Sequence, residues 1–415
     1  MSKDVVIIGG GIIGLSTAYY LIKEGHKVTV VDQSDISSGA SFVNAGYITP
    51  SHFIPLAAPG MISKGIKYMF DKTSPFYMKP RFDLDFLKWS WNFKKSSTKS
   101  NVEKAIPVLK DINLLSRELY KEIKQSSDFN FSFDQKGLLM CYKTNKAGEE
   151  EMLIAERAVE QGLNAQNLSL KELEKLDPNA HLDVKGAIYY EDDAHMTPEE
   201  YMVELQSFLK SKGVVFYTSE KVVDLEFKHH KVSKVITDKR ILNADEIVVS
   251  AGSWSPIITK KLGLQIPIQA GKGYRINVNR ETGISMPAIL LEAKVAVTPM
   301  NGFTRFAGTM EIGGINHEIS PVRVKTIANA AENYYKNLTV EKHELESAAC
   351  GLRPCTPDGL PYIGRPINYK NIVIATGHAM MGWSLGPATG KLVSEIISEQ
   401  KTSLDLTPFH PDRKF

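Results

Sequence analysis

Cysteine is scarce in this chain of 415 residues, and its scarcity excludes several classes of protein. The three cysteines are Cys141, Cys350 and Cys355. So sparse and odd a set does not build a disulfide framework, and it lacks the paired spacing of a zinc site. We therefore expect a reducing compartment, the cytoplasm, and no metal ion.

Excess charge of one sign and long apolar runs are also missing. Lysine and arginine number 50 against 47 acidic residues, a net charge of +3 that argues against a nucleic-acid partner. The most apolar stretch, residues 5–22, is interrupted by Gly9, Gly10, Gly11 and Gly14, which fits neither a spanning helix nor a signal peptide. There is no internal repeat, and at roughly 150 residues per domain the length predicts two or three domains.

Apolar periodicity divides the chain into strands and helices. Residues 5–8 form the continuous apolar run of a buried parallel strand, and residues 13–23 have helical composition. Thr197 and Glu200 predict a capped helix start, with the helix ending at Gly213. Further strands are expected at 27–31, 137–142, 214–217, 222–227, 231–237, 246–250, 371–375 and within a β-rich block at 266–314; further helices are expected at 104–125, 148–162, 321–337 and 391–398.

A dinucleotide-binding fingerprint lies between the first predicted strand and the first predicted helix. Gly9, Gly11 and Gly14 satisfy the G-x-G-x-x-G pattern, and Asp32 ends the next strand. The glycines allow a tight turn, close approach of the backbone to a pyrophosphate and close helix–strand packing. The aspartate accepts hydrogen bonds from the adenosine ribose, and its charge disfavours a 2′-phosphate.

A second glycine-rich junction near the other end of the chain helps to choose between dinucleotides. Residues 376–390 follow one predicted strand and lead into a predicted helix. A cofactor that is contacted from both ends of the chain is long and carries a bulky ring. The two junctions together favour FAD over NAD.

Several segments resemble a known family, the FAD-dependent amine and amino-acid oxidoreductases that include D-amino-acid oxidase, glycine oxidase and sarcosine oxidase. Beyond the fingerprint, the matching segments are SFVNAGYITP at 41–50, AAPG at 57–60, LKWSW at 87–91, GLRPCTPDG at 351–359 and TGHAMMGWSLGPATG at 376–390. Within this family the chain is most similar to the bacterial D-amino-acid dehydrogenases of the small-subunit type, over nearly its whole length.

The resemblance implies a set of cofactor contacts. Those expected at the ADP half are Gly9, Gly11, Ile12, Ile13, Gly14, Asp32 and Gln33, with Val222 at the adenine and Ala251, Gly252 and Trp254 at the pyrophosphate. Those expected at the flavin ring are Ser41, Asn44, Ala45, Gly46, Gly377, His378, Met381, Gly382 and Trp383. Sarcosine oxidases attach their flavin to a cysteine, but Cys350 and Cys355 do not align with it, so FAD is expected to be non-covalent.

Four residues are candidates near the substrate, two of them, Arg353 and His378, through the resemblance. Arg353 is expected to clamp the substrate carboxylate, because a planar and permanently charged fork suits a carboxylate in an apolar pocket. Tyr274 either covers the substrate or packs in the core. His195 either reaches the substrate or is a polar residue at a helix start. His378 acts through its backbone at least as much as through its ring.

The expected architecture is an α/β fold with two parts. A discontinuous Rossmann-like FAD-binding domain comprises residues 1–60, 150–265 and 348–415. An α+β substrate domain with a mixed or antiparallel sheet comprises residues 61–149 and 266–347, as in D-amino-acid oxidase and glycine oxidase.

The expected reaction is oxidative deamination of a small D-amino acid to a 2-oxo acid and ammonia. The Cα hydrogen passes as hydride to flavin N5, and the electrons pass to a quinone or another electron-transfer acceptor rather than to O2. Two alternatives stay open. One is a narrow substrate such as D-proline, a hydroxy-D-proline, sarcosine or glycine; the other is a flavin-binding subunit of an electron-transfer complex.

Residues 52–95 combine aromatic side chains with lysines, which suits either a peripheral membrane contact or a lid over the substrate site. The aromatic residues are Phe53, Tyr68, Phe70, Phe76, Tyr77, Phe86, Trp89, Trp91 and Phe93. A membrane contact would place the protein at the inner face of the plasma membrane.

Overall fold

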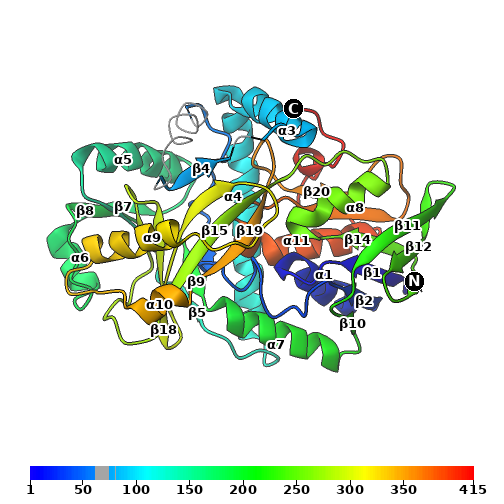
Figure 1. The fold of residues 1–415 in the computed structure, drawn as a ribbon, viewed down its shortest axis with the longest axis horizontal. Helices are drawn as coiled ribbons and strands as arrows, with labels where there is room; N and C mark the ends of the chain where they lie inside the picture. The colour runs from blue at the N-terminus through cyan, green and yellow to red at the C-terminus, as the bar shows by residue number, and fades with distance from the viewer. Residues whose placement is uncertain (61–73, 80) are drawn as a thin grey trace.

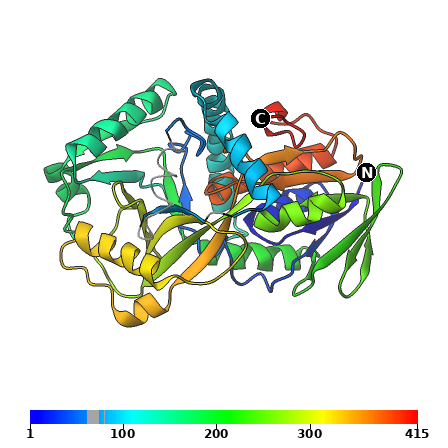
Figure 2. The same ribbon diagram turned by 45° about the horizontal axis from the view of Figure 1, so that its top comes forward.

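A computed structural model describes residues 1–60, 74–79 and 81–415. Two large sheets lie at opposite ends of the molecule, and both chain termini lie beside the smaller one (Figure 1). The long helix α4 (Lys99–Gln125) stands between the two sheets in both views (Figure 2). The predicted α/β fold, with one mostly parallel sheet and a second mixed sheet, is confirmed.

The smaller sheet has six strands in the order β10-β2-β1-β14-β21-β20. All neighbours pair in parallel except β20 and β21. The central strands are buried on both faces, which is why they are continuous runs of valine and isoleucine. Their bounds are β1 Asp4–Ile8, β2 Lys27–Val31, β10 Val215–Tyr217, β14 Glu246–Val249, β20 Tyr362–Gly364 and β21 Ile372–Thr376.

The larger sheet has nine strands and both parallel and antiparallel pairs. Its path is β19-β15-β18-β17-β16-β6-β8-β7, and β4 pairs with β18. The bounds are β4 Phe76–Met78, β6 Leu138–Tyr142, β7 Ala165–Ser169, β8 Gly186–Tyr190, β15 Gln269–Val278, β16 Ala288–Leu290, β17 Val295–Met300, β18 Phe303–Ile312 and β19 Ala349–Cys355. Two three-stranded sheets complete the fold: β11 (Val222–Lys228), β12 (Lys231–Thr237) and β13 (Ile241–Asn243), and β3 (Tyr47–Ile48), β9 (Ala194–Met196) and β5 (Phe133–Asp134).

The helices cover the outer faces of the two large sheets and fill the space between them (Figure 1). Besides α4 they are α1 Ile12–Lys23, α3 Leu84–Ser96, α5 Asn145–Glu160, α6 Leu170–Leu176, α7 Pro198–Ser211, α8 Ser255–Lys261, α9 Pro321–Tyr334, α10 Lys342–Glu346 and α11 Gly382–Ile397, with short 3₁₀ turns at Gly252–Trp254 and Thr407–Phe409.

Helix α11 begins earlier than the sequence predicts. We expected a loop over 376–390 and a helix only from 391, because glycine and proline usually mark loops. The glycines instead let α11 lie against α1: a Cβ on Gly390 would lie 2.5 Å from the backbone of Ser16, and one on Gly386 would lie 3.0 Å from Ile12. Gly386 and Gly390 are therefore required by helix–helix contact and not by a turn.

Helix α7 begins and ends where predicted, but its capping box is absent. Thr197 occupies the N-cap without a side-chain bond to the helix, and its hydroxyl accepts the backbone N–H of Asn301 at 2.9 Å. Glu200 accepts the backbone N–H of Ser132 at 2.8 Å. The two side chains bind neighbouring segments instead of the helix end. Spacing in the sequence does not reveal these tertiary hydrogen bonds, which replace the capping box.

The strand pairing also changes the domain boundaries that we propose. Residues 150–265 were expected to belong wholly to the FAD-binding domain. However, β7 and β8 pair with each other and β8 pairs with β6, all within the nine-stranded sheet. We propose that residues 165–190 belong to the substrate domain.

Candidate active site

One cavity of about 1260 Å³ extends from the carboxyl end of β1 to the inner face of the nine-stranded sheet. Its volume exceeds the roughly 300–1,000 Å³ of ordinary small-molecule pockets. The predicted residues that line it are Gly9, Gly11, Ile12, Ile13, Asp32, Gln33, Ser41, Asn44, Ala45, Val222, Ala251, Gly252, Trp254, Tyr274, Arg353, His378, Met381, Gly382 and Trp383. Gly14, Gly46, Gly377 and His195 lie outside its lining.

The segment from the end of β1 to the first turn of α1 shows why the fingerprint needs its glycines. Gly9 has φ +111°, and a Cβ there would lie 2.5 Å from the carbonyl oxygen of Ser250. A Cβ on Gly14 would lie 1.9 Å from the carbonyl oxygen of Gly9. Gly14 therefore acts through helix–strand packing and not by touching the ligand. The helix N-terminus faces the cavity and is suited to a pyrophosphate.

Asp32 lies half-buried at the end of β2, as predicted. Its Oδ2 accepts the backbone N–H of Gly10 at 2.7 Å, and its Oδ1 accepts the N–H and the hydroxyl of Ser34, both at 2.7 Å. These bonds fix the carboxylate at the rim of the cavity, where the remaining lone pairs suit ribose hydroxyls.

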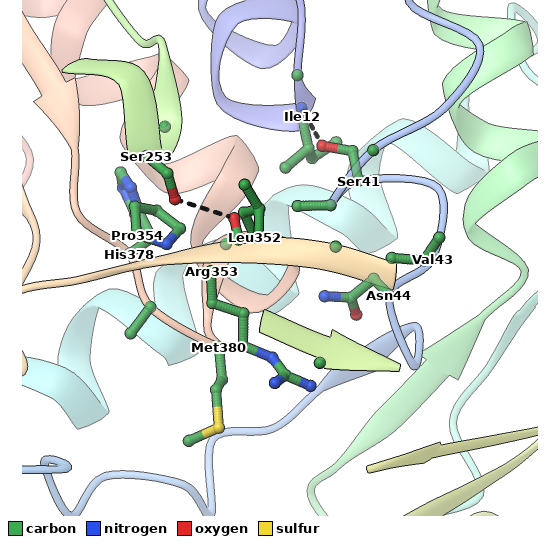
Figure 3. Close-up of a pocket in the computed structure, with 18 of the residues that line it drawn as sticks. Ile12, Ser41, Val43, Asn44, Ser253, Leu352, Arg353, Pro354, His378 and Met380 are labelled. Atoms are coloured by element: carbon green, nitrogen blue, oxygen red, sulfur yellow. Dashed lines mark hydrogen bonds between the residues drawn. The ribbon is translucent and has the colours of Figure 1, made fainter. Parts of the chain in front are cut away.

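The loop after β2 is fixed by residues from three other elements. The Ser41 hydroxyl accepts the backbone N–H of Ile12 at 3.0 Å, a bond shown in Figure 3. The Trp383 indole donates to the carbonyl of Ser41 at 2.8 Å. Arg305, whose side chain is fully buried, donates to the carbonyls of Phe42 at 2.9 Å and Asn44 at 2.7 Å. With these carbonyls held from outside, the loop is presented to the cavity in one conformation.

His378 contributes through its backbone. Its ring is buried and bonded through Nε2 to the hydroxyl of Thr389 at 3.0 Å, and burial lowers its pKa to about 3. A ring that stays neutral and already has a partner is poorly suited to act as a base. The backbone pairs with Cys355, and the following Ala379 N–H donates to the carbonyl of Pro354 at 2.9 Å. This joins the tail of the chain to β19 beside the cavity.

These features fit FAD. The cavity offers a helix N-terminus for a pyrophosphate, a fixed carboxylate for a ribose and a lining from the second glycine-rich segment, 376–390. All three cysteines are buried, and none of them lines the cavity. A non-covalently bound flavin is consistent with that placement.

Arg353 projects from β19 into the cavity between Asn44 and Met380 (Figure 3). Its Nη1 donates to the carbonyl of Thr309 at 2.7 Å, and it forms no ion pair with a carboxylate of the described chain. Burial lowers the pKa of the guanidinium, though its charge is retained. Gly273 makes room for it, since a Cβ there would lie 2.2 Å from Nη1. The remaining donors are available to an anionic ligand.

Thr309 holds Arg353 from a strained backbone. Its φ is +63°, which is exceptional for a β-branched residue. The strain arises at a bulge, where Thr309 and Met310 on β18 both lie opposite Gly273 on β15. Strained backbone of this kind persists where the surrounding structure imposes it, often at functional sites. The bulge turns the Thr309 carbonyl toward the arginine.

Tyr274 lines the cavity with its ring, but its hydroxyl is already engaged. The hydroxyl donates to Oε2 of Glu311 at 2.9 Å, and Arg323 Nε lies 3.1 Å from the same carboxylate oxygen. Burial and the Glu311 charge raise the pKa of Tyr274. The phenol proton therefore points away from the ligand, so Tyr274 is placed to cover a substrate and not to donate to its carboxylate.

His195 does not meet the other predicted residues. It pairs through β9 with Tyr47 and Asp134, and it lines a separate pocket of about 340 Å³. Burial lowers its pKa to about 4, although Asp134 lies 3.7 Å from its Nε2. The interpretation as a polar residue near a helix start fits this placement, whereas a substrate contact does not.

Comparison with known proteins agrees with this geometry. The family model described as FAD dependent oxidoreductase matches residues 4–396. The chain belongs to the FAD dependent oxidoreductase family. The resemblance stated from the sequence is thus confirmed, and this flavoenzyme uses FAD as its cofactor.

Relatives and solved structures add detail. The chain is 31% identical over 403 residues to a D-amino acid dehydrogenase of Helicobacter pylori, covering 95% of each chain. It is 32% identical over 418 residues to one of Vibrio vulnificus, covering 97% of this chain and 98% of the relative. The fold is similar to glycine oxidase from Geobacillus kaustophilus, with a TM-score of 0.78 at 21% identity, covering 100% and 99% of the two chains.

Three contributors to the flavoenzyme site escaped prediction. Arg305, Thr309 and Gly273 act by fixing the Asn44 loop and Arg353, across strands that are distant in sequence. Arg305 leaves one signal, because it is the single charged residue in the run 295–310. Thr309 and Gly273 leave none, because their roles depend on a bulge and a cross-strand contact.

Proposed function

We propose that this flavoenzyme oxidises D-amino acids to imino acids, which hydrolyse to 2-oxo acids and ammonia, and passes the electrons to a quinone or another acceptor rather than to O2. The observation that supports it best is Arg353, a guanidinium with available donors in the cavity that fits FAD. Relatives that match nearly the whole chain at 27–32% identity are named D-amino acid dehydrogenase.

The chain's own residues provide binding and orientation. Arg353 holds the substrate carboxylate, and Thr309 and Gly273 fix the direction of its guanidinium. Three small residues of the nine-stranded sheet line the cavity and leave space for the substrate: Ala296 on β17 and Ala307 and Gly308 on β18. FAD, when bound, supplies the hydride acceptor. Positioning of this kind contributes much of the rate in flavin-dependent oxidation.

The proposal is tested by steady-state turnover with D-alanine and a water-soluble quinone analogue, in air and under nitrogen. We expect pyruvate and ammonia at equal rates in both gases, with little hydrogen peroxide. Peroxide formed in proportion to pyruvate would identify an oxidase and contradict the acceptor. Turnover of only D-proline, hydroxy-D-proline, sarcosine or glycine would establish the narrow-substrate alternative, and a flavin that no amine reduces would support the electron-transfer subunit.

Helix α3 is the surface that we propose for contact with the membrane that holds a quinone. Its inner side chains Phe86, Trp89 and Phe93 are buried, and Trp89 Nε1 donates to the carbonyl of Cys355 at 2.9 Å, so this side forms part of the wall behind β19. Its outer side chains are exposed, with Leu84 at 74% and Trp91 at 57% of their full area. Tyr68 and Phe70 lie outside the described residues.

Charge near this apolar surface suits an anionic bilayer. Phe82 and Leu87 are also exposed and add to the apolar surface formed by Leu84 and Trp91. The ammonium groups of Lys94 and Lys95 lie 5.7 and 5.9 Å from the centre of the Trp91 ring. Aromatic residues with flanking lysines are typical of interfacial helices. None of the described helices is both long and apolar enough to span a bilayer.

A vesicle experiment checks this surface. The double variant Leu87→Ser and Trp91→Ser is expected to lose most of the protein's binding to phosphatidylglycerol vesicles, because it removes two exposed apolar side chains. Turnover with the soluble quinone analogue should be unchanged. Leu153→Ser on α5, where 62% of the side chain is exposed, is the matched control and should bind vesicles like the natural protein. Equal binding by all three proteins would remove α3 from the proposal.

A further inference from the structure

A chain of hydrogen bonds leads from the cavity to a buried carboxyl group that has no part in the functions assigned above. His52 lines the cavity, and its Nδ1 lies 3.1 Å from the hydroxyl oxygen of Ser51. The Ser51 hydroxyl lies 2.5 Å from Oδ2 of Asp193, and the Ser51 N–H donates to Oδ1 at 3.1 Å. Asp193 is 1% exposed and pairs with no cation within 4.0 Å in the described chain.

The direction of these bonds follows from the number of protons. A serine hydroxyl has one hydrogen, and an ionised Asp193 takes it. Nδ1 of His52 must then donate to Ser51, which leaves Nε2 without a proton. When Asp193 is neutral, its own hydrogen can go to Ser51, Ser51 donates to Nδ1, and Nε2 carries the proton. The charge of Asp193 therefore sets whether His52 offers an acceptor or a donor at Nε2.

His52 and Arg353, the carboxylate clamp, line the same cavity. Extending the register Val295↔Gly308 by one residue places Lys294 opposite Thr309, whose carbonyl binds Arg353. The Lys294 charge also reaches His52, since it contributes to lowering the pKa of that ring. Lys294 and His52 both line the cavity. A substrate held by Arg353 therefore shares this cavity with the Lys294 ammonium group and the His52 imidazole.

We propose that Asp193, Ser51 and His52 form a proton relay that accepts the ammonium proton of the bound amino acid. The inference depends on the proposed function, because an amino acid must bind as an ammonium ion and lose one proton before its Cα hydrogen can leave as hydride. His52 Nε2 takes the ammonium proton, His52 Nδ1 gives its own proton to Ser51, and the Ser51 proton passes to Asp193. One N–H bond breaks on the substrate, one O–H bond forms on Asp193, and no electrons move.

The surrounding charges favour this direction of transfer. Arg353 disfavours an ammonium ion near it, which lowers the pKa of the bound amino group. His52 is neutral, its pKa lowered to about 4 by burial. Burial raises the pKa of Asp193 to about 7, against the opposing effect of the Ser51 bonds. A carboxyl group with a pKa near neutrality is suited to accept a proton at the working pH.

The other carboxyl groups around the relay are engaged with other residues. Asp192, next to Asp193, is paired with Arg117 of α4 at 2.9 Å. Glu151 of α5 accepts the hydroxyl of Tyr190 at 2.9 Å, and burial raises the pKa of that carboxyl. Glu292, which lines the cavity, accepts the N–H and the hydroxyl of Thr144. Asp193 is therefore the buried carboxyl that the chain from His52 reaches.

The test is the pH dependence of anaerobic flavin reduction by D-alanine, measured by rapid mixing for the natural protein and for His52→Gln, Ser51→Ala and Asp193→Asn. The natural rate should rise with pH through about 7, as Asp193 ionises and becomes able to accept. The variants should be slower by about 10²-fold at pH 7, the lower range for general base catalysis. All four rates should converge at high pH, where the amine is already neutral in solution.

Asp177 and Ser285 provide the matched control. Ser285 donates its hydroxyl to Asp177 Oδ1 at 2.8 Å, and Asp177 is also buried, but neither residue lines the FAD cavity. Asp177→Asn and Ser285→Ala should keep the natural pH profile. Equal rates at every pH for the relay variants, which retain bound FAD, would overturn the relay and leave the function intact. Failure of the natural protein to be reduced by any D-amino acid would instead reject the function.

Discussion

Replacing Arg353 with methionine is expected to raise KM for D-amino acids by at least about 100-fold while FAD remains bound. Hydrogen bonds to charged groups contribute about 1.5–3 kcal/mol each, and the clamp forms two of them. Each 1.4 kcal/mol corresponds to a tenfold change in affinity. Arg353→Lys keeps the charge but not the planar fork, so we expect it to fall between the two proteins. Steady-state kinetics with D-alanine measure the effect.

Arg275→Met is the control for this prediction. Arg275 belongs to the neighbouring strand β15 and donates to the carbonyl of Ser347 at 3.1 Å, but it does not line the cavity. It should leave KM within a few-fold of the natural value. An Arg353→Met protein with unchanged KM would place the carboxylate elsewhere and contradict the proposed site.

Exchanging Gly14 for alanine is expected to abolish stable FAD binding. The added Cβ would lie 1.9 Å from the carbonyl oxygen of Gly9, so α1 must move away from β1. Backbone cannot move aside as a flexible side chain does, and the displaced helix no longer presents its first N–H groups to the pyrophosphate. The purified protein should be colourless and less stable, as shown by its visible spectrum and its thermal unfolding.

The matched control is Gly263→Ala. Gly263 follows the end of helix α8 with φ +68°, and nothing lies within 4 Å of where its Cβ would be. It should cost roughly 1 kcal/mol of stability and leave the flavin in place. A yellow Gly14→Ala protein with natural flavin content would refute the packing argument.

The sequence predicts the nucleotide half of this molecule well because the physical signals there are local. A buried parallel strand, a helix start and a glycine pattern follow one another within residues 4–23, and Asp32 ends the next strand. The sequence predicts too short a helix α11, because glycines usually indicate a loop, whereas Gly386 and Gly390 allow contact with α1. Composition cannot separate those two uses of glycine.

The substrate half is less predictable because its contacts join distant parts of the chain. In the sequence only the motif at 351–359 points to Arg353 as a candidate. Its neighbours Gly273 and Thr309 come from two other strands. For His195 the sequence leaves a substrate contact and a polar residue at a helix start both open, and its place in a separate pocket favours the second. His52 follows the matching segment 41–50, but the sequence does not show that Ser51 joins it to Asp193, which is distant in the chain.

The most direct test of the central claim is anaerobic mixing of the purified protein with D-alanine and L-alanine while the visible spectrum is recorded. We predict a flavin spectrum that D-alanine bleaches and L-alanine leaves unchanged, because Arg353 fixes the carboxylate and only one enantiomer then directs its Cα hydrogen at the ring. Bleaching by L-alanine alone, or by neither enantiomer nor any other D-amino acid, would contradict the account.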